Sequence, residues 1–265
     1  MQARIVTPLR GAAWFAEGWR MFKAAPFGWF ALVFTYWLLM TIASVVPFIG
    51  VVLASTAVPA FSVGFMAAGR AASARGGVEL SLLFEGFRHA PRSQAILGVV
   101  YFACLVTVLG ASAAIDGGAL ARWMITGARP AEDTLQSGEF LAALAAAAAV
   151  YAPVMMMFWF APPLAAWHGT GPAKALFFSF YGCLLNWRAF LAYGAVTAVL
   201  AIGVPFAAVL VLMLVTRGAS TLPMVSLAFP LLLVLLPTLF ASFYASYRDV
   251  FGPPVADDRG IIPAQ

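Results

Sequence analysis

The amino-acid sequence predicts an all-α integral membrane protein whose chain crosses the bilayer six times. Hydrophobic residues make up 63% of the chain and charged residues 9%, and the mean hydropathy is +0.95. Soluble domains are roughly 45–50% apolar and about 25% charged. This chain therefore has too few polar residues to cover a water-soluble core, and lipid must surround most of it.

The positions of the spans follow from the lengths of the apolar stretches. A bilayer core of about 30 Å needs roughly 20 apolar residues in helical form. Five uncharged stretches reach that length, namely residues 27–69, 93–115, 140–167, 189–216 and 218–247. The first is long enough for two spans and is interrupted by Val-Pro-Phe-Ile-Gly at residues 46–50. Because proline disfavours helix in the preceding residue, we expect a turn there and six spans in total.

These spans are expected to form a single transmembrane domain over residues 1–252. The tail, residues 253–265, contains prolines and aspartates and few large apolar residues, and it is expected to be disordered. In the longest loop, residues 116–139, a short helix is expected at about residues 118–125.

The basic residues predict which side of the membrane each loop faces. With six alternating spans, twelve cations fall on one side and three on the other. The twelve are Arg4, Arg10, Arg20, Lys23, Arg70, Arg75, Arg88, Arg92, Lys174, Arg188, Arg248 and Arg259, and the three are Arg122, Arg129 and Arg217. Cytoplasmic loops carry the excess of Lys and Arg. The sequence therefore predicts a bacterial inner-membrane protein with both termini in the cytoplasm.

The net charge of +5 does not indicate nucleic-acid binding, because the cations occur singly or in loose pairs between apolar segments. That pattern suits anionic lipid headgroups, which favour each nearby cation by about 1 kcal/mol. We therefore expect membrane lipids as partners and no nucleic acid. Another membrane protein or a second copy of the chain are the alternatives left open.

Three segments on the predicted cytoplasmic side have the apolar spacing of amphipathic helices, at residues 11–25, 80–88 and, more weakly, 172–188. In each, aromatic and aliphatic side chains share one arc and charged side chains the other. Such a helix is expected to lie in the membrane interface. The candidate contacts to headgroups or to a partner are the cations of these three segments, Arg20, Lys23, Arg88, Lys174 and Arg188.

An internal repeat is predicted because each amphipathic segment precedes a pair of spans. Residues 17–20 (Glu-Gly-Trp-Arg) and 85–88 (Glu-Gly-Phe-Arg) share a tetrad, of which the third segment keeps Tyr181 and Gly182. A proline also stands before the end of the second span of each pair, at Pro59, Pro163 and Pro237. We expect three hairpins in units 7–70, 76–168 and 171–250. Chance recurrence of short aromatic–glycine–basic strings is the alternative.

Signatures of catalysis and of ion coupling are missing from the sequence. An ionisable residue at the centre of a span costs roughly 2.5–3.5 kcal/mol and is usually kept for function, yet none is obvious in these spans. The two histidines, His89 and His168, cannot form a zinc-binding H-E-x-x-H motif, and no nucleophile elbow or phosphate loop occurs. We expect no enzyme activity, no catalytic or metal site and no cofactor.

The leading hypothesis is a non-enzymatic scaffold or accessory subunit that engages lipid or a membrane partner. The alternative is a transporter or permeation path for a lipid-like or apolar solute, with a mid-membrane cavity lined by uncharged polar groups such as Thr41, Ser44, Thr107, Tyr151 and Thr197. A membrane-embedded enzyme is third. It would require several of a group of ionisable residues to meet in one cleft, namely Glu17, Glu85, His89, His168 and Asp249.

Other features predict packing rather than chemistry. Asn186, the single asparagine, is expected to make a helix-terminal or interhelical hydrogen bond. Rows of small residues allow helices to approach closely, and they occur at Ala60, Gly64 and Ala68 and again at Gly110 and Ala114. The nearly all-alanine residues 142–149 predict a tightly enclosed central helix.

Three stretches together resemble a family of uncharacterised proteobacterial six-span membrane proteins. They are residues 18–26 before the first span, residues 59–66 within the second, and the closing residues 244–251. The resemblance covers nearly the whole chain. It implies inner-membrane residence and the three-unit architecture, and it assigns no functional residue.

Overall fold

A computed structural model of the protein describes residues 2–46, 49–217 and 224–252, without the side chains of residues 224–230. Every regular element within these ranges is a helix. Six of the helices are long and apolar enough to cross a membrane. The all-α class and the six candidate spans are thus confirmed. The tail that we expected to be disordered, residues 253–265, lies outside the described residues.

Each candidate span lies close to its predicted range. They are α2 (Pro26–Val45), α3 (Gly50–Ser73), α5 (Pro91–Asp116), α8 (Gly138–His168), the continuous run α10 (Trp187–Ala198), η2 (Val199–Gly203) and α11 (Val204–Val215), and α12 (Met224–Phe251). The helix break expected at residues 46–50 separates α2 from α3. The segment η2 is a π-helix that ends two residues before Pro205. A proline lacks the N–H that would continue the regular ladder, so the helix is altered there.

The loop between α5 and α8 contains the short helix that the sequence predicts, α6 (Ala119–Thr126), and a single turn, α7 (Glu132–Leu135). Two successive glycines, Gly117 and Gly118, have φ values of +62° and +89°. The Asp116 carboxylate accepts hydrogen bonds from the N–H groups of Gly118 (2.9 Å) and Leu120 (2.8 Å). The reversal therefore combines glycine's tolerance of positive φ with capping of the next helix.

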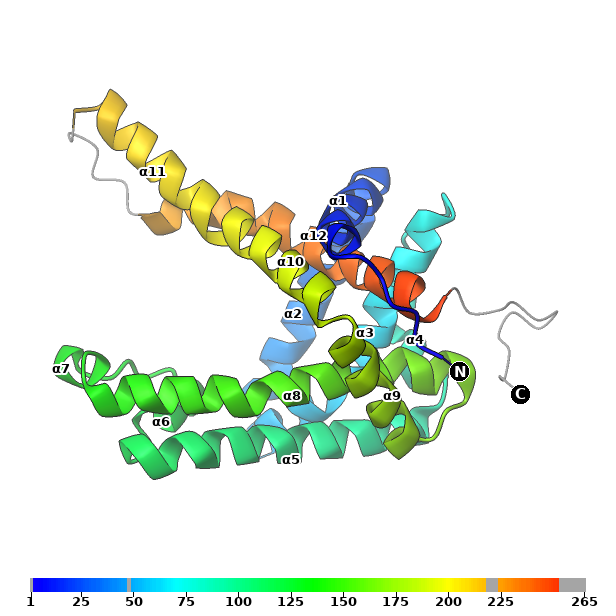
Figure 1. The fold of residues 1–265 in the computed structure, drawn as a ribbon, viewed down its shortest axis with the longest axis horizontal. Coiled ribbons are helices and arrows are strands. Elements are labelled where there is room, and N and C mark those ends of the chain that lie inside the picture. The colour runs from blue at the N-terminus through cyan, green and yellow to red at the C-terminus, as the bar shows by residue number, and fades with distance from the viewer. Residues whose placement is uncertain (1, 47–48, 218–223, 253–265) are drawn as a thin grey trace.

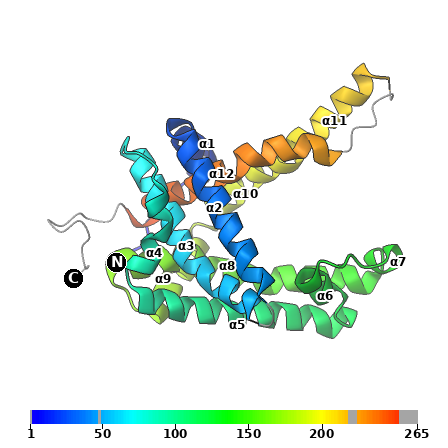
Figure 2. The same ribbon diagram turned by 180° about the vertical axis from the view of Figure 1, so that it is seen from behind.

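The spans pair as antiparallel neighbours in chain order, and the pairs diverge from one end (Figure 1). Seen from behind, α11 and α7 lie far apart while α3, α8 and α12 come together (Figure 2). We call residues 59–72 of α3, 160–168 of α8 and 241–251 of α12 the packed half. The splayed half comprises residues 100–116 of α5, 138–150 of α8 and 199–215 of η2 and α11.

The largest buried cluster lies in the packed half. Phe65, Phe160, Trp167 and Tyr247 are at most 2% exposed there. In the splayed half most side chains of α11 are exposed, with Leu214 71% exposed. Such exposed apolar side chains on candidate spans mark the surface that lipid would cover.

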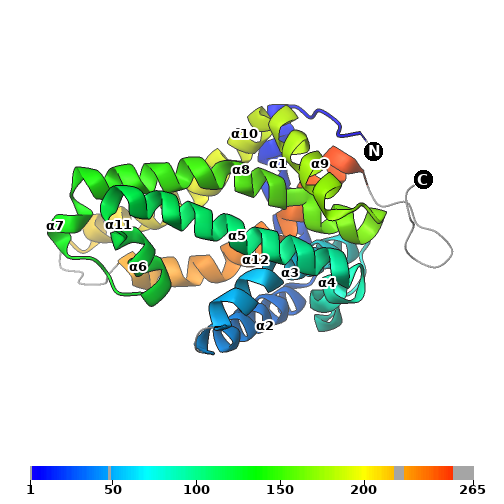
Figure 3. The ribbon, with the colours of Figure 1, turned by 90° about the horizontal axis from the view of Figure 1, so that it is seen from below.

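One packing expectation is wrong. Of the alanine-rich residues 142–149, Ala143 is buried, whereas Ala145, Ala148 and Ala149 are exposed. Here α8 runs alongside α5 (Figure 3), and the side chains of these alanines on its other faces are exposed. The row at Ala60, Gly64 and Ala68 is buried as predicted, but a Cβ at Gly110 would meet nothing within 4 Å. Small residues therefore mark close packing in α3 and a lipid-facing surface in α8.

The first amphipathic segment forms helix α1 (Pro8–Ala24), but its apolar face is covered by protein. Trp14 is fully buried and makes edge-to-face contacts with Phe190 and Tyr193 of α10, at 5.2 and 5.9 Å. A Cβ at Gly18 would overlap the backbone of α12. Glycine thus allows α1 to lie directly against the last hairpin.

The other two segments differ from the predicted continuous helices. Residues 80–88 form a 3₁₀ turn, η1 (Leu80–Phe84), followed by one α-turn, α4 (Glu85–Arg88). The third segment is α9 (Pro172–Leu185), and it ends at Asn186, so Arg188 belongs to the first turn of α10. Interfacial placement of all three segments stays a prediction.

The three segments pack in a cyclic pattern. The η1–α4 segment packs on α3, α9 packs on α8, and α1 packs on α10 and α12. Each therefore contacts the hairpin that precedes it, with α1 closing the cycle on the last hairpin. The three units and the repeat that they imply stay a prediction.

Candidate functional site

A network of ion pairs joins α1 to the end of α12. One oxygen of Asp249 accepts hydrogen bonds from Arg10 Nε (2.9 Å), the Arg10 guanidinium NH₂ (2.6 Å) and Trp14 Nε1 (2.9 Å). Glu17 pairs with Arg10 at 3.0 Å and also with Arg248. The hydrogen bond to Asp249 raises the pKa of Arg10 above its ordinary value. Both carboxylates are 12% exposed, so these charges are largely removed from water and held in pairs.

A second ion pair joins α4 to the end of α3. Glu85 lies 3.4 Å from Arg70 and 3.5 Å from His89 Nδ1. Glu85 and Glu17 open the two matching tetrads, and their arginine partners each stand eleven residues after a span proline, Pro59 or Pro237. The tetrad glutamates therefore make equivalent contacts. The third segment has Tyr181 at the position of the glutamate and lacks such an ion pair among the described residues.

The ionisable residues named for a membrane-embedded enzyme divide among separate contacts. Glu17 and Asp249 share the first network, Glu85 and His89 the second. The remaining member, His168, bonds the Tyr247 hydroxyl through Nε2 at 2.6 Å, linking α8 to α12. Within the described ranges, no three His, Cys, Asp or Glu side chains gather as a metal site would require.

Asn186 makes the interhelical hydrogen bonds that the sequence predicts. It is 1% exposed, accepts from the Val6 N–H at 2.8 Å and donates to the Arg4 and Gly182 carbonyls, both at 2.9 Å. The Arg4 N–H donates to the Val250 carbonyl at 2.8 Å. The N-terminal segment that precedes α1 is therefore held between the start of α10 and the end of α12.

A polar hollow of about 520 Å³ opens beside the first network, between α1, the end of α3 and α12. It is lined by Glu17, Arg20, Met21, Ala72, Ser73, Arg75 and Arg248, and we call it the basic hollow. Glu17 is matched by Arg248, whereas Arg20 and Arg75 have no ion-pair partner among the described residues. The hollow thus holds two uncompensated positive charges.

Arg75 has an unusual backbone conformation for its residue type. It follows the last turn of α3 with a φ of +58°. Its N–H bonds the Ala72 carbonyl at 3.2 Å, and the Gly76 N–H bonds the Ala71 carbonyl at 2.9 Å. This is a Schellman cap, whose left-handed position glycine usually occupies. A side chain there costs about 1–2 kcal/mol, so a strained residue lines the hollow.

The five cations predicted as headgroup or partner contacts are all exposed: Arg20, Lys23, Arg88, Lys174 and Arg188. None takes part in an ion pair within the described ranges. Three lie over aromatic rings, with Lys23 5.4 Å from the Trp19 centroid, for example. One of the five, Arg20, lines the basic hollow.

Two members of the hollow, Arg75 and Arg248, were missed as site residues. Arg248 follows Pro237 by the same number of residues as Arg70 follows Pro59. This spacing was a signal that could have indicated the position of Arg248 beside the tetrad glutamate. Nothing local in the sequence indicates the left-handed conformation of Arg75, because Gly76 follows it and would be the expected residue for that conformation.

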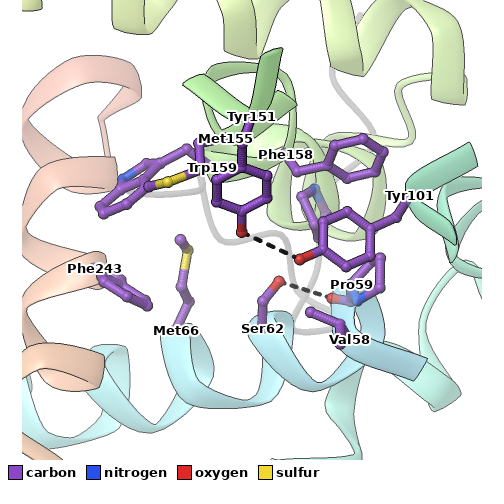
Figure 4. A pocket seen from close by; sticks show the side chains of 11 residues that line it. Val58, Pro59, Ser62, Met66, Tyr101, Tyr151, Met155, Phe158, Trp159 and Phe243 are labelled. Carbon is purple, nitrogen blue, oxygen red and sulfur yellow. Dashed lines mark hydrogen bonds between the residues drawn. The ribbon is translucent and has the colours of Figure 1, made fainter. Parts of the chain in front are cut away.

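A second cavity, of about 210 Å³, lies between α3, α5 and α8 (Figure 4). We call it the tyrosine pocket. Tyr101 of α5 and Tyr151 of α8 point their hydroxyls at one another across it, 3.4 Å apart. The other lining residues are Val58, Pro59, Ser62, Met66, Met155, Phe158, Trp159, Pro162 and Phe243. The pocket is therefore almost wholly apolar and carries no charged side chain.

Comparison with known proteins gives one informative match. The chain is 41% identical over 258 residues to a protein of Burkholderia thailandensis described as a probable inner membrane protein, and the match covers 95% of this chain and 94% of the relative. The chain belongs to the family of that inner membrane protein. No family model matches the sequence, and no solved structure matches it. This match confirms the resemblance to uncharacterised membrane proteins. With the six candidate spans, it also supports the assignment of the chain as a multi-pass inner-membrane protein.

The relative is described only as an inner membrane protein. Cavities within the membrane-spanning helices are therefore relevant to lipid contacts. Of the polar groups expected in a mid-membrane cavity, Tyr151 lines the tyrosine pocket and Thr197 lines a larger apolar hollow of about 750 Å³ between α8, α10 and α12. Ser44, Thr107 and Thr197 each donate their hydroxyl to a carbonyl of their own helix.

Proposed function

We propose that this protein is a non-enzymatic scaffold or accessory subunit of the inner membrane that holds anionic lipid headgroups in the basic hollow. The observation that carries the proposal is Arg75. It lines a hollow with two uncompensated positive charges, its own among them, and its backbone keeps a conformation that glycine would adopt without strain.

The surroundings of the hollow suit a headgroup rather than a free ion. Lys23 and Trp19 lie exposed on α1, and cations with neighbouring aromatic rings are typical of residues at the level of lipid headgroups. By the positive-inside rule the face that carries them is cytoplasmic, where anionic lipids attract cations. The paired charges of the network would hold α1 in place, and the unpaired ones would meet the lipid.

The test measures lipid retention by the full-length protein in nanodiscs that contain zwitterionic and anionic phospholipids. Native mass spectrometry counts the anionic lipids retained. We expect Arg75→Gly to reduce retention roughly five-fold, since each cation contributes about 1 kcal/mol near an anionic surface. It should also raise the free energy of unfolding by roughly 0.5–1 kcal/mol, because glycine relieves the positive φ.

Ala90→Gly is the matched control. Ala90 also has a positive φ, +54°, and does not line the hollow. It should stabilise the protein to a similar extent while leaving lipid retention unchanged. Equal retention by wild type and Arg75→Gly would refute the headgroup site, and full competition by millimolar inorganic phosphate would assign the hollow to a soluble anion instead.

The scaffold role has a separate test. Pulldowns in mild detergent should recover a partner membrane protein, and deletion should alter envelope composition. A protein that stays monodisperse without partners, in a strain whose envelope is unchanged, would contradict this role.

A permeation path for a lipid-like or apolar solute is the second candidate, favoured by the tyrosine pocket. It predicts movement of a labelled lipid between the leaflets of proteoliposomes, abolished when Val58→Phe fills the pocket. A scaffold would leave that movement at the level of protein-free vesicles.

A further inference from the structure

We propose that the tyrosine pocket is a binding site for a neutral, apolar molecule that bears a carbonyl oxygen, and that Tyr101 and Tyr151 recognise this oxygen. The pocket is separate from the basic hollow, with which it shares no lining residue. The two proposals can therefore fail independently.

The tyrosine hydroxyls have unused hydrogen-bonding capacity. Their separation of 3.4 Å exceeds the usual 2.7–2.8 Å of an O–H···O bond. When one hydroxyl donates to the other, the second still has a proton to donate. A ligand oxygen between them could accept a hydrogen bond from both. Polar groups in an apolar site are usually hydrogen-bonded, which favours this arrangement of the two hydroxyls.

Other polar side chains of the pocket are already engaged. The Ser62 hydroxyl donates to the Pro59 carbonyl at 2.8 Å, and Trp159 Nε1 donates to Ser246 Oγ at 3.1 Å. Recognition thus falls to the two phenols, both of which donate. Because no charged side chain lines the pocket, an ionised ligand would be unpaired there, and the ligand must be neutral.

The size and setting of the pocket suit a ring or an ester group attached to a chain. A dry cavity of about 150 Å³ can hold benzene, and this one measures about 210 Å³. Met155, Trp159 and Phe243 line both this pocket and the 750 Å³ apolar hollow beneath α10, so the two are neighbours. Met155 is 40% exposed, which opens this region to the surrounding lipid. A chain could therefore extend from the pocket into that hollow.

Two membrane molecules have this chemistry, a quinone and the acyl ester of a phospholipid. The test places wild-type protein in nanodiscs of diether phospholipid, which contains no carbonyl group. Either a ¹³C-carbonyl-labelled decyl-benzoquinone or a ¹³C-ester phosphatidylethanolamine is added, and isotope-edited infrared spectra record the carbonyl band. A hydrogen bond to a carbonyl oxygen lowers the stretching frequency of that carbonyl. A saturable shifted band with the first probe assigns the site to a quinone, and with the second to the lipid ester.

The double variant Tyr101→Phe with Tyr151→Phe keeps the pocket's shape and removes both hydroxyls. It should abolish the shifted band and weaken binding about ten-fold for the loss of two hydrogen bonds. Tyr181→Phe, at an exposed position of α9, is the matched control and should change neither. Val58→Phe should block binding by occupying the pocket with both tyrosines intact.

Wild-type measurements decide the proposal even if the double variant fails to fold. Decylbenzene, which lacks the carbonyl groups, should displace the quinone at least ten-fold less effectively than unlabelled quinone does. Absence of a shifted band with both probes, equal displacement by decylbenzene, or a band that persists in the folded double variant would each overturn the proposal.

Discussion

The packed half and the splayed half of the bundle consist of similarly apolar helices, yet they bury their side chains to different extents. In α8 the residues from Phe160 to Trp167 are all buried, whereas Leu141 and Leu144 near the other end of the same helix are 56% and 49% exposed. Hydrophobicity does not separate the two halves, because lipid solvates an apolar side chain as well as a protein neighbour does.

Glycine contacts and paired polar groups are what distinguish the packed half. Neighbouring helices approach it at positions where a Cβ would overlap its backbone, as Gly18 of α1 does at α12 and Gly86 of α4 does at α3. Its polar residues form hydrogen bonds between elements, such as His168 with Tyr247 and Tyr193 with Ser242. In lipid these two kinds of contact hold helices together, so substitutions at such contacts should have large effects, and substitutions at exposed positions of the splayed half should have small ones.

The largest difference is expected for a matched pair of glycines. A Cβ at Gly86 would overlap the backbone of Ala60, so Gly86→Ala should lower the free energy of unfolding by about 3 kcal/mol. Gly110→Ala in the splayed half meets nothing within 4 Å and should change it by less than about 0.5 kcal/mol. Unfolding in mixed detergent–SDS micelles measures both. Equal losses would show that the two halves pack alike.

The charged groups offer a second, smaller contrast. Asp249→Asn weakens three hydrogen bonds to Arg10 and Trp14 in a site that is 12% exposed, and it should cost about 2 kcal/mol. Glu132→Gln breaks an exposed pair with Arg129 in the loop of the splayed half, where the two side chains are 68% and 67% exposed. It should cost about 0.5 kcal/mol or less. A loss at Glu132 that matched the one at Asp249 would remove the contrast.

Span number and position were predictable because the length of an apolar run is a local property of the sequence. The helix break between Val45 and Gly50 and the short helix α6 were predictable for the same reason, since proline, glycine and Asp116 act on their immediate neighbours. Asn186 was also interpreted correctly, because an isolated amide in apolar surroundings must find hydrogen-bond partners.

Contacts between distant segments were not predictable from one sequence. The apolar arc of α1 has the same composition whether lipid or α12 covers it, so the burial of Trp14 gave no local signal. Likewise the basic hollow needs Arg20, Arg75 and Arg248 from three elements, of which the sequence suggested the first. The alanine-rich stretch of α8 was misread because small residues permit close packing without requiring it.

That stretch provides the smallest expected effect. Ala148→Leu adds a large apolar side chain at an exposed position of α8, where lipid would solvate it, and should change the free energy of unfolding by less than about 0.5 kcal/mol. Ala143→Leu, five residues earlier on the buried side of the same helix, should lose about 1–3 kcal/mol through overpacking. The same micelle titration compares them. If Ala148→Leu were as damaging as Ala143→Leu, another chain or copy would have to cover that face, and the splayed half would be a protein interface rather than a lipid-facing surface.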